Sequence, residues 1–338
     1  MKSTRIALAS RPHGVPTHDN FLIEDVDLPD PSAGQVALQT LHLSLDPYMR
    51  ARMNDAKSYA TPTPIGGTMP GATVSRVLES NDPGFAAGDI VLGYGGWQTH
   101  SVESVGHLRM LDPEQAPIST ALGVLGMPGF TAYSGLREIG KPQPGETVVV
   151  AAAAGPVGST VGQIAKIAGA RAVGIAGGPE KVAFLRDELG FDVALDHRSP
   201  DFADQLAAAA PDGIDVYFEN VGGPVFDAVL PLLNSYARVP VCGLASQYNA
   251  TGLPEGPDRM GLLMGQILQR SLTVRGFIQT EFADRLGTDF LTEATRWVAD
   301  GSLKYREDFA HGLDQTIDAF VGMLAGRNFG KQIVTLAD

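Results

Sequence analysis

The strongest constraint on the fold is a short apolar strand that runs directly into a glycine-rich turn and a helix. The stretch Thr147–Ala152 is followed by AAGPVGSTVGQIAK, with glycines at Gly155, Gly158 and Gly162. Free backbone N–H groups at the start of such a helix favour an anion. We expect Gly155 to turn the chain, Gly158 to let the backbone approach a pyrophosphate, and Gly162 to allow close helix–strand packing.

Strand and helix patterns alternate through the region that follows. Strands are expected at TVVVAAAA, RAVGIAG, DVALDH, IDVYFENV, ARVPVCGLA and LTVRGFI, and helices over 157–169, 180–189, 200–210, 224–233 and 258–270. Such alternation predicts βαβ units, and therefore an α/β Rossmann domain with a doubly wound parallel sheet. The glycine spacing is not the strict G-x-G-x-x-G and alone would also fit a plain tight connection. Its place in a repeating βαβ region favours dinucleotide binding.

The part of the chain before residue 123 has a different character. GQVALQTLHLSLDP, GATVSRVLES and GDIVLGYGGWQTHSV are alternating or apolar runs bounded by turn residues, which predicts a β-rich domain. The chain ends with a helix, a glycine turn and a last strand, which we expect to return to the first domain. The predicted domains are therefore 1–122 completed by 308–338, and 123–307.

Composition narrows the partners. Asp and Glu number 38 against 25 Lys and Arg, and the formal charge of −13 disfavours a nucleic-acid partner. The single cysteine, Cys242, excludes an internal disulfide and a multi-cysteine zinc site, and it fits a reducing compartment. No apolar run is long enough for a signal peptide or a membrane span. We expect a cytoplasmic protein with a small-molecule substrate.

The choice of cofactor depends on the end of the second strand. An acid that holds the ribose of NAD is expected about 20 residues after the glycine turn, where this chain has Gly177-Gly178. Lys181 and Arg198 lie close enough in sequence to approach a 2′-phosphate there. One charge-assisted hydrogen bond is worth about 1.5–3 kcal/mol, so NADP(H) is favoured over NAD(H). The alternative is that both are solvated surface charges.

Eight motifs together resemble one known family. They are LDPYMRARM, MPGFTAYSGL, AAAGPVGSTVGQIAK, GGPEK, DVYFENVGG, CGLASQYN, RGFI and GRNFGKQIV. Through them the chain resembles the zinc-free medium-chain dehydrogenases/reductases, and most closely the group of prostaglandin reductase, leukotriene B4 dehydrogenase and alkenal double-bond reductase. The resemblance covers nearly the whole chain and implies a GroES-like first domain, a Rossmann domain, NADPH and a homodimer.

The resemblance also implies site residues. Gly155, Pro156, Val157 and Gly158 would face the pyrophosphate, and Lys181 would hold the 2′-phosphate. Gly178, His197 and Arg198 are further predicted cofactor-binding residues beside it. Asn220, Cys242, Gly243, Leu244, Ser246 and Tyr248 would line the nucleotide, with Phe277, Ile278 and Asn328 close to the nicotinamide half. The family often has tyrosine where this chain has His197. A histidine can still bind a phosphate, in a pH-sensitive way.

A catalytic zinc is disfavoured. Zinc alcohol dehydrogenases usually carry Gly-His-Glu where this chain has Gly71-Ala72-Thr73, and the seven histidines form no close-spaced ligand pair. Without a Lewis acid a plain carbonyl is hard to reduce. A conjugated enone is easier, because hydride can add at the β-carbon while charge moves to the carbonyl oxygen.

The expected activity is therefore NADPH-dependent reduction of the carbon–carbon double bond of α,β-unsaturated ketones or aldehydes. A phenol can donate a hydrogen bond to the enolate oxygen, and Tyr248 and Tyr48 are the two candidates. Two alternatives remain open: an NADPH quinone oxidoreductase, and an NADPH-binding structural or sensor protein without turnover. The loops at 54–65 and 249–260 are expected to border the substrate pocket.

Overall fold

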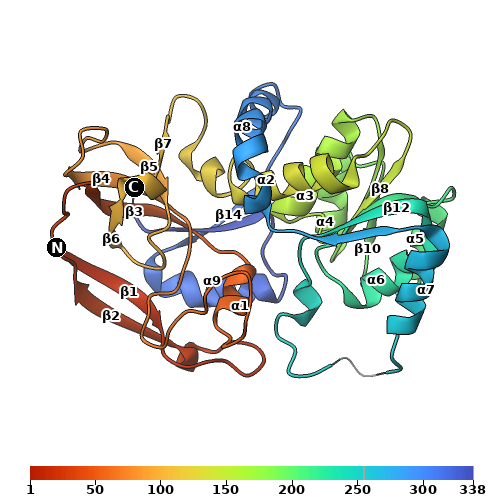
Figure 1. Ribbon diagram of the computed structural model, residues 1–338, viewed down its shortest axis with the longest axis horizontal. Coiled ribbons are helices and arrows are strands. Elements are labelled where there is room, and N and C mark those ends of the chain that lie inside the picture. Colours follow the sequence, from red (N-terminus) through yellow and green to blue (C-terminus); the bar gives the residue numbers. More distant parts are fainter. Residues whose placement is uncertain (254–255, 338) are drawn as a thin grey trace. The chain divides into compact units, whose positions relative to one another are not determined.

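The computed structural model describes residues 1–253 and 256–337 and divides into two compact units (Figure 1). We call Val124–Arg306 the α/β unit, and we call Met1–Gly123 with the segment from Glu307 to the C-terminus the β unit. The predicted loop at 249–260 includes residues 254–255, which lie outside the described residues. In the described ranges, no helix has both the length and the apolar character that a bilayer crossing requires.

The α/β unit is built on a six-stranded parallel sheet in the order β10-β9-β8-β11-β12-β13. Its strands are β8 (Thr147–Val150), β9 (Arg171–Ala176), β10 (Val193–Asp196), β11 (Ile214–Phe218), β12 (Leu233–Val241) and β13 (Thr273–Gly276). The winding direction reverses between β8 and β11, which pair in register at Val148 and Val216. Ligands of such sheets bind beyond the carboxyl ends of the strands at this reversal. The predicted Rossmann fold is confirmed.

Helices cover both faces of this sheet. They are α2 (Met127–Gly135), α3 (Pro156–Ile167), α4 (Pro179–Ala183), α5 (Phe202–Ala209), α6 (Gly223–Val229), α7 (Met260–Arg270) and α8 (Ala283–Ala299). One core joins the sheet to α5 and α6 through residues such as Val149, Leu206 and Val229. On the opposite face, α3 packs on β8 and β9. Every residue of β8 is buried, which explains its uninterrupted run of apolar and β-branched side chains.

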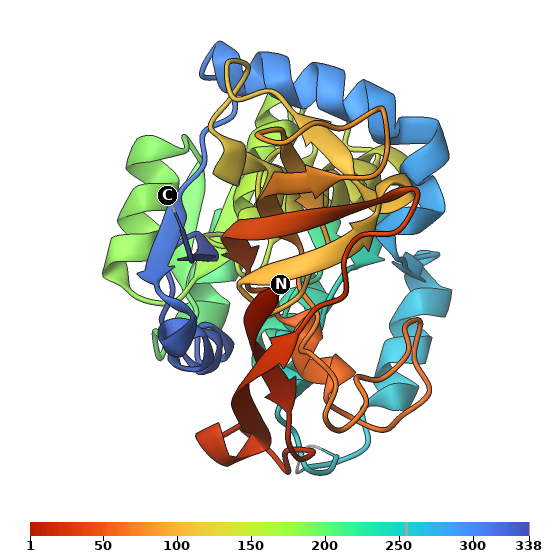
Figure 2. The same ribbon diagram turned by 90° about the vertical axis from the view of Figure 1, so that its left-hand side faces the viewer.

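The β unit contains a seven-stranded sheet and a separate two-stranded ribbon. The sheet runs β14 (Glu307–His311), β15 (Lys331–Thr335), β3 (Gln35–Ser44), β4 (Thr73–Ser80), β5 (Ile90–Gly93) and β7 (Arg109–Leu111), with β6 (His100–Ser104) paired to β3. The last strand, β15, pairs antiparallel with β3. Figure 2 shows the ribbon of β1 (Lys2–Leu8) and β2 (Phe21–Asp27) in red.

An aromatic core fills the β unit between its strands and α9 (Thr316–Leu324). Trp97 is fully buried and stacks on Phe21 at 5.7 Å between ring centroids, while Phe320 of α9 meets it edge-on at 5.2 Å. The short helix α1 (Tyr48–Arg52) lies against this core through Met49. The position of Tyr48 is thus fixed by a buried neighbour in the sequence.

Candidate active site

The turn after β8 is made by an alanine. Gly155 has φ −82° and ψ 169°, an extended conformation that any residue adopts, whereas Ala152 takes a left-handed φ of 51°. Gly155 closes the turn, because its N–H donates to the carbonyl oxygen of Ala152 at 3.0 Å. The left-handed conformation of this turn is carried by Ala152, a residue with a Cβ, and not by the glycine.

Gly158 and Gly162 are needed for close contacts within the protein. A Cβ on Gly158 would lie 2.5 Å from the carbonyl oxygen of Ala152. A Cβ on Gly162 would lie 1.9 Å from the Phe191 ring, which also covers Gly174 of β9. The ring thus fills the space between α3 and the sheet, so the predicted helix–strand packing of Gly162 goes through Phe191.

The first turn of α3 presents backbone donors beyond the end of β8. Pro156 is the first helical residue and has no N–H, and the first residue bonded back into the helix is Ser159, whose N–H donates to Gly155 at 2.9 Å. The N–H groups of Val157 and Gly158 come before that bond, as in any helix start. This end of α3 can therefore bind an anion.

The end of β9 meets the turn after β10. A Cβ on Gly177 would lie 2.9 Å from Nε2 of His197 and 3.1 Å from Nε and Nη2 of Arg198. Two basic side chains thus occupy the space that an acidic side chain would need at this position. Gly178 follows with φ +97°, a conformation that favours glycine. The absence of an acid here has a steric reason in addition to an electrostatic one.

Asp196, which the sequence analysis does not name as a site residue, stabilises the turn after β10 through hydrogen bonds. Its carboxylate accepts the backbone N–H of Arg198 at 3.0 Å and also that of Gly178. Desolvation alone would raise the pKa of Asp196, but these hydrogen bonds outweigh it and lower that pKa. The carboxylate therefore ties the ends of β9 and β10 together. Lys181, half-buried on α4, adds a third basic group that repels a proton from His197.

The reversal point of the sheet is closed by two neighbouring side chains. Asn220 donates from Nδ2 to the carbonyl oxygen of Ala151 at 2.9 Å, which links the ends of β11 and β8. Glu219 is buried, and its carboxylate accepts the N–H groups of Val221 and Gly222 at 2.7 and 2.8 Å. Glu219 was missed from the sequence, although an acid directly after an apolar strand in FENVGG was the available signal.

The segment after β12 folds back onto this point. The N–H groups of Cys242 and Gly243 both donate to the carbonyl oxygen of Glu219, at 2.9 and 3.2 Å. Strand β12 therefore ends at Val241, and the strand predicted over 237–245 is too long at its C-terminal end. Ser246 donates from Oγ to the carbonyl oxygen of Val221 at 2.6 Å. Burial raises the pKa of the Cys242 thiol to about 12, and the charge of Glu219 acts in the same direction. The Cys242 thiol therefore keeps its proton at neutral pH.

Tyr248 lies over this folded segment. A Cβ on Gly243 would lie 2.8 Å from the hydroxyl oxygen of Tyr248, so the phenol rests above a glycine on the turn that follows β12. The side chain of Leu244 lies beside Gly222, 3.1 Å from where a Cβ would stand. Asn220, Cys242, Gly243, Leu244, Ser246 and Tyr248 are thus brought together at one edge of the sheet.

Phe277 and Ile278 follow β13 at the same edge. The Phe277 ring is buried against Phe218 and Phe282, each at 6.1 Å between centroids. The N–H of Phe277 donates to Val241 at 3.3 Å and that of Ile278 to the Glu281 carboxylate at 2.9 Å. Both N–H groups are therefore engaged within the protein, and the carbonyl oxygen of Ile278 also accepts the N–H of Glu281 at 2.9 Å.

Tyr48 and Asn328 belong to the β unit. Burial, and then the negative charge of Asp46, raise the pKa of Tyr48 well above its ordinary value, so the phenol keeps its proton at neutral pH. Asp46 forms a buried ion pair with Lys331 at 2.5 Å, a pair that sequence patterns do not reveal. Asn328 donates from Nδ2 to the carbonyl oxygen of Gly330 at 2.8 Å.

Gly71, the first residue of the Gly71-Ala72-Thr73 stretch that replaces Gly-His-Glu, is enclosed by apolar side chains. A Cβ on Gly71 would lie within 3.3 Å of Leu43, Trp97 and Met49. Throughout the described chain, no group of three or more His, Cys, Asp or Glu side chains is arranged to hold a metal ion.

Comparisons with known proteins cover both units. Two family models match: one described as the N-terminal domain of oxidoreductase over residues 4–111, and one described as zinc-binding dehydrogenase over 156–298. The chain is 54% identical to the NADPH-dependent curcumin reductase of Escherichia coli, over 99% of this chain and 97% of that protein. It is 42% identical to prostaglandin reductase 1 of Rattus norvegicus, over 95% of each.

Among solved structures, CurA from Vibrio vulnificus in complex with NADPH matches with a TM-score of 0.96 and 52% identity, over 99% of each chain. The similarity thus extends over the whole length and includes every segment described above.

Proposed function

Because the chain belongs to the medium-chain dehydrogenase/reductase family, in the group that includes prostaglandin reductase 1 and NADPH-dependent curcumin reductase, we propose that it is an NADPH-dependent reductase of the carbon–carbon double bond in α,β-unsaturated ketones and aldehydes. One observation carries the proposal. His197, Arg198 and Lys181 form a basic cluster near Gly177, at the end of β9, where the strand is not followed by an acid. The phenol of Tyr248, beyond β12, lies at the same carboxyl end of this parallel sheet.

The residues at this edge fit NADPH. The N–H groups of Val157 and Gly158 bind the pyrophosphate at the start of α3. His197, Arg198 and Lys181 bind the 2′-phosphate near Gly177, where the absence of a Cβ lets the His197 and Arg198 side chains approach. Asn220 and the segment from Cys242 to Tyr248 line the nucleotide, and Gly178, Phe277, Ile278 and Asn328 complete the proposed set.

When bound, NADPH supplies a hydride. The protein's task is then to orient the enone and to stabilise the negative charge that collects on its carbonyl oxygen. We assign Tyr248 as the donor to that oxygen, with Tyr48 as the second candidate, since both are phenols that can donate at neutral pH. No metal enters the proposed reaction.

A substrate panel tests this function. The protein is mixed with NADPH and a simple enone, an enal, or a quinone, and the loss of nicotinamide absorbance is followed. Turnover of enones and enals at rates well above that of the quinone supports the proposal. Turnover of the quinone alone supports a quinone oxidoreductase, and tight NADPH binding without turnover of any substrate supports a sensor or structural protein.

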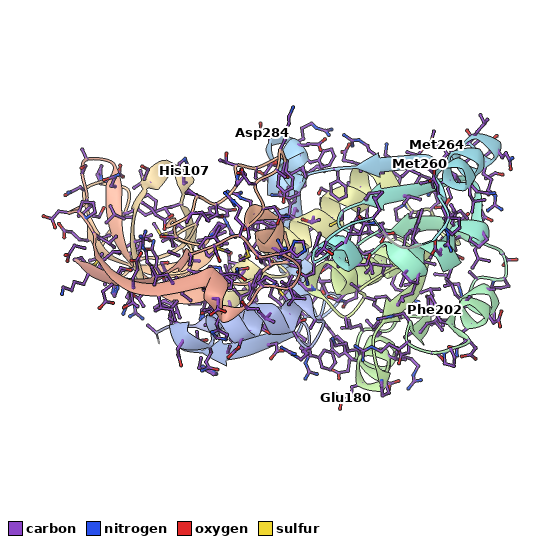
Figure 3. The ribbon with its side chains drawn as sticks, turned by 90° about the horizontal axis from the view of Figure 1, so that it is seen from below. His107, Glu180, Phe202, Met260, Met264 and Asp284 are labelled. Carbon is purple, nitrogen blue, oxygen red and sulfur yellow. The ribbon has the colours of Figure 1, made fainter. Side chains whose placement is uncertain are left out.

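The open side of β13, the last strand of the sheet, supports a homodimer. In the described part of the chain, β13 is the last strand of the sheet, and all four of its residues are exposed. Beside it, α7 has no buried residue, and Figure 3 shows Met260 and Met264 along this helix. Leu268 is 82% exposed. An open strand edge next to large apolar side chains needs a cover, and a second copy of β13 can pair with it across a twofold axis.

Sedimentation of the purified protein tests this assembly. We expect a dimer that dissociates when Val274→Arg places a charge on β13. A monomeric wild-type protein would remove the dimer from the proposal. The cytoplasmic location and the domain limits 1–122 with 308–338 and 123–307 stay predictions.

A further inference from the structure

The basic cluster at the end of β9 contains one group that titrates near neutral pH. His197 and Arg198 both approach Gly177, and the backbone bond from Arg198 to Asp196 fixes the turn that carries them. His197 therefore lies where the proposed 2′-phosphate would bind. His197 is exposed, so a ligand can reach its ring from solvent.

Three charged groups face the His197 ring from its own turn and from α4. The pKa of His197 lies below its ordinary value, because desolvation disfavours the charged ring and because Arg198 and Lys181 repel a further positive charge. Asp196 and a hydrogen bond between the ring and its own backbone act in the opposite direction and offset this only in part. In the free protein at neutral pH, the ring is therefore mostly uncharged.

A 2′-phosphate carries close to two negative charges at neutral pH. Opposite charge within about 4–6 Å favours the charged form of a titrating group. Placed among Lys181, Arg198 and His197, the phosphate neutralises the repulsion that keeps the ring uncharged and adds an acceptor for a second ring N–H. NADH lacks this phosphate and leaves the ring as it is.

We propose that binding of the NADP cofactor, in contrast to NAD, is coupled to uptake of one proton from solvent by His197. The proposal rests on the proposed function only for the location of the 2′-phosphate. The proton comes from water or buffer and forms one N–H bond on the imidazole, and no bond of the cofactor changes. The preference for NADP over NAD then depends on pH through this residue.

The direction of the pH dependence follows from linkage. The pKa of His197 is higher in the complex than in the free protein, so the affinity for NADP⁺ is greatest at low pH and falls as pH rises through the pKa of the complex. The fall is at most about tenfold per pH unit for one proton. The small fraction of free 2′-phosphate that still carries a proton loses it on binding to cations. This release acts in the opposite direction, because it weakens NADP⁺ binding at low pH.

Calorimetric titration of the full-length protein with NADP⁺ tests the coupling. At about pH 7 the titration is repeated in Mops and Tris, whose ionisation enthalpies differ, and the dependence of the observed enthalpy on buffer gives the number of protons exchanged. We expect uptake of about 0.3 to 1 proton per NADP⁺ bound, as one group near its midpoint allows, and none for NAD⁺. Zero exchange, or net proton release, with NADP⁺ would overturn the proposal.

Two variants assign the proton. His197→Gln keeps a hydrogen-bond donor but cannot titrate, so it should bind NADP⁺ without proton uptake; uptake that persists would contradict the assignment. His107→Gln, which changes an exposed histidine of the β unit, should take up protons as the wild type does. No enone is present in these titrations. Proton uptake in a protein that fails to reduce enones would therefore reject the proposed function and leave this inference intact.

Discussion

Adding one methyl group at Gly177 should weaken NADPH binding while leaving the fold intact. In Gly177→Ala the new Cβ would stand 2.9 Å from Nε2 of His197 and 3.1 Å from the Arg198 guanidinium, so both groups must move. Both belong to the ends of exposed side chains, and Gly177 itself has no left-handed φ. The free energy of unfolding should therefore change by no more than about 0.5 kcal/mol.

The binding loss can be estimated from the contacts that are displaced. Losing one charge-assisted hydrogen bond to the 2′-phosphate costs about 1.5–3 kcal/mol, which is roughly a 10- to 100-fold rise in the NADPH dissociation constant. The NADH constant should stay within about twofold, since that cofactor has no group at this position. Fluorescence titration measures the dissociation constants of NADPH and NADH, and thermal unfolding measures the change in stability.

Gly287→Ala is the matched control, because a Cβ at this position in α8 meets nothing within 4 Å. It should leave both dissociation constants unchanged and maintain or slightly raise stability, as alanine favours a helix. If Gly177→Ala keeps the wild-type ratio of the two constants, then His197 and Arg198 do not bind the 2′-phosphate, and the reasoning about this edge of the sheet is refuted.

Four further outcomes are expected. Lys181→Glu should weaken NADPH binding at least about tenfold with little effect on NADH; an unchanged kcat/KM ratio for the two cofactors removes Lys181 from the site. Tyr248→Phe should lower kcat on an enone by about 10- to 100-fold with little change in KM, and a wild-type kcat would make Tyr48 or a water the donor. The purified protein should contain no stoichiometric zinc and keep its turnover with a chelator; one zinc per chain that is needed for activity would overturn the mechanism. Gly162→Ala should destabilise the fold by about 1–3 kcal/mol because its Cβ would overlap the Phe191 ring, whereas Gly287→Ala in open space should not; equal melting temperatures would contradict this packing.

The sequence was sufficient for the architecture where local patterns and topology agree. The apolar strand of β8, the turn and α3 form one unit, and the alternation that follows allows few arrangements other than a parallel sheet. The absence of an acid at Gly177-Gly178 was also predictable from the sequence, because it depends only on the residue types at a fixed distance from the glycine turn.

The roles of individual residues were harder to predict, because they depend on contacts between distant segments. Gly162 meets Phe191, and Gly177 meets His197, about 20 to 30 positions further along the chain. Asp196 and Glu219 hold loops through backbone N–H groups, and a sequence pattern does not show which donors a carboxylate will reach. The left-handed φ of 51° at Ala152 likewise cannot be predicted from the residue type, since alanine does not favour this conformation.

The regiochemistry of hydride addition tests the central claim most directly. The protein is incubated with NADPH that carries deuterium at its transferable position and with a simple acyclic enone, and the product is identified by NMR and mass spectrometry. The account predicts a saturated ketone with one deuterium on the β-carbon. An allylic alcohol with deuterium on the carbonyl carbon would contradict it, because the enzyme would then be a carbonyl reductase.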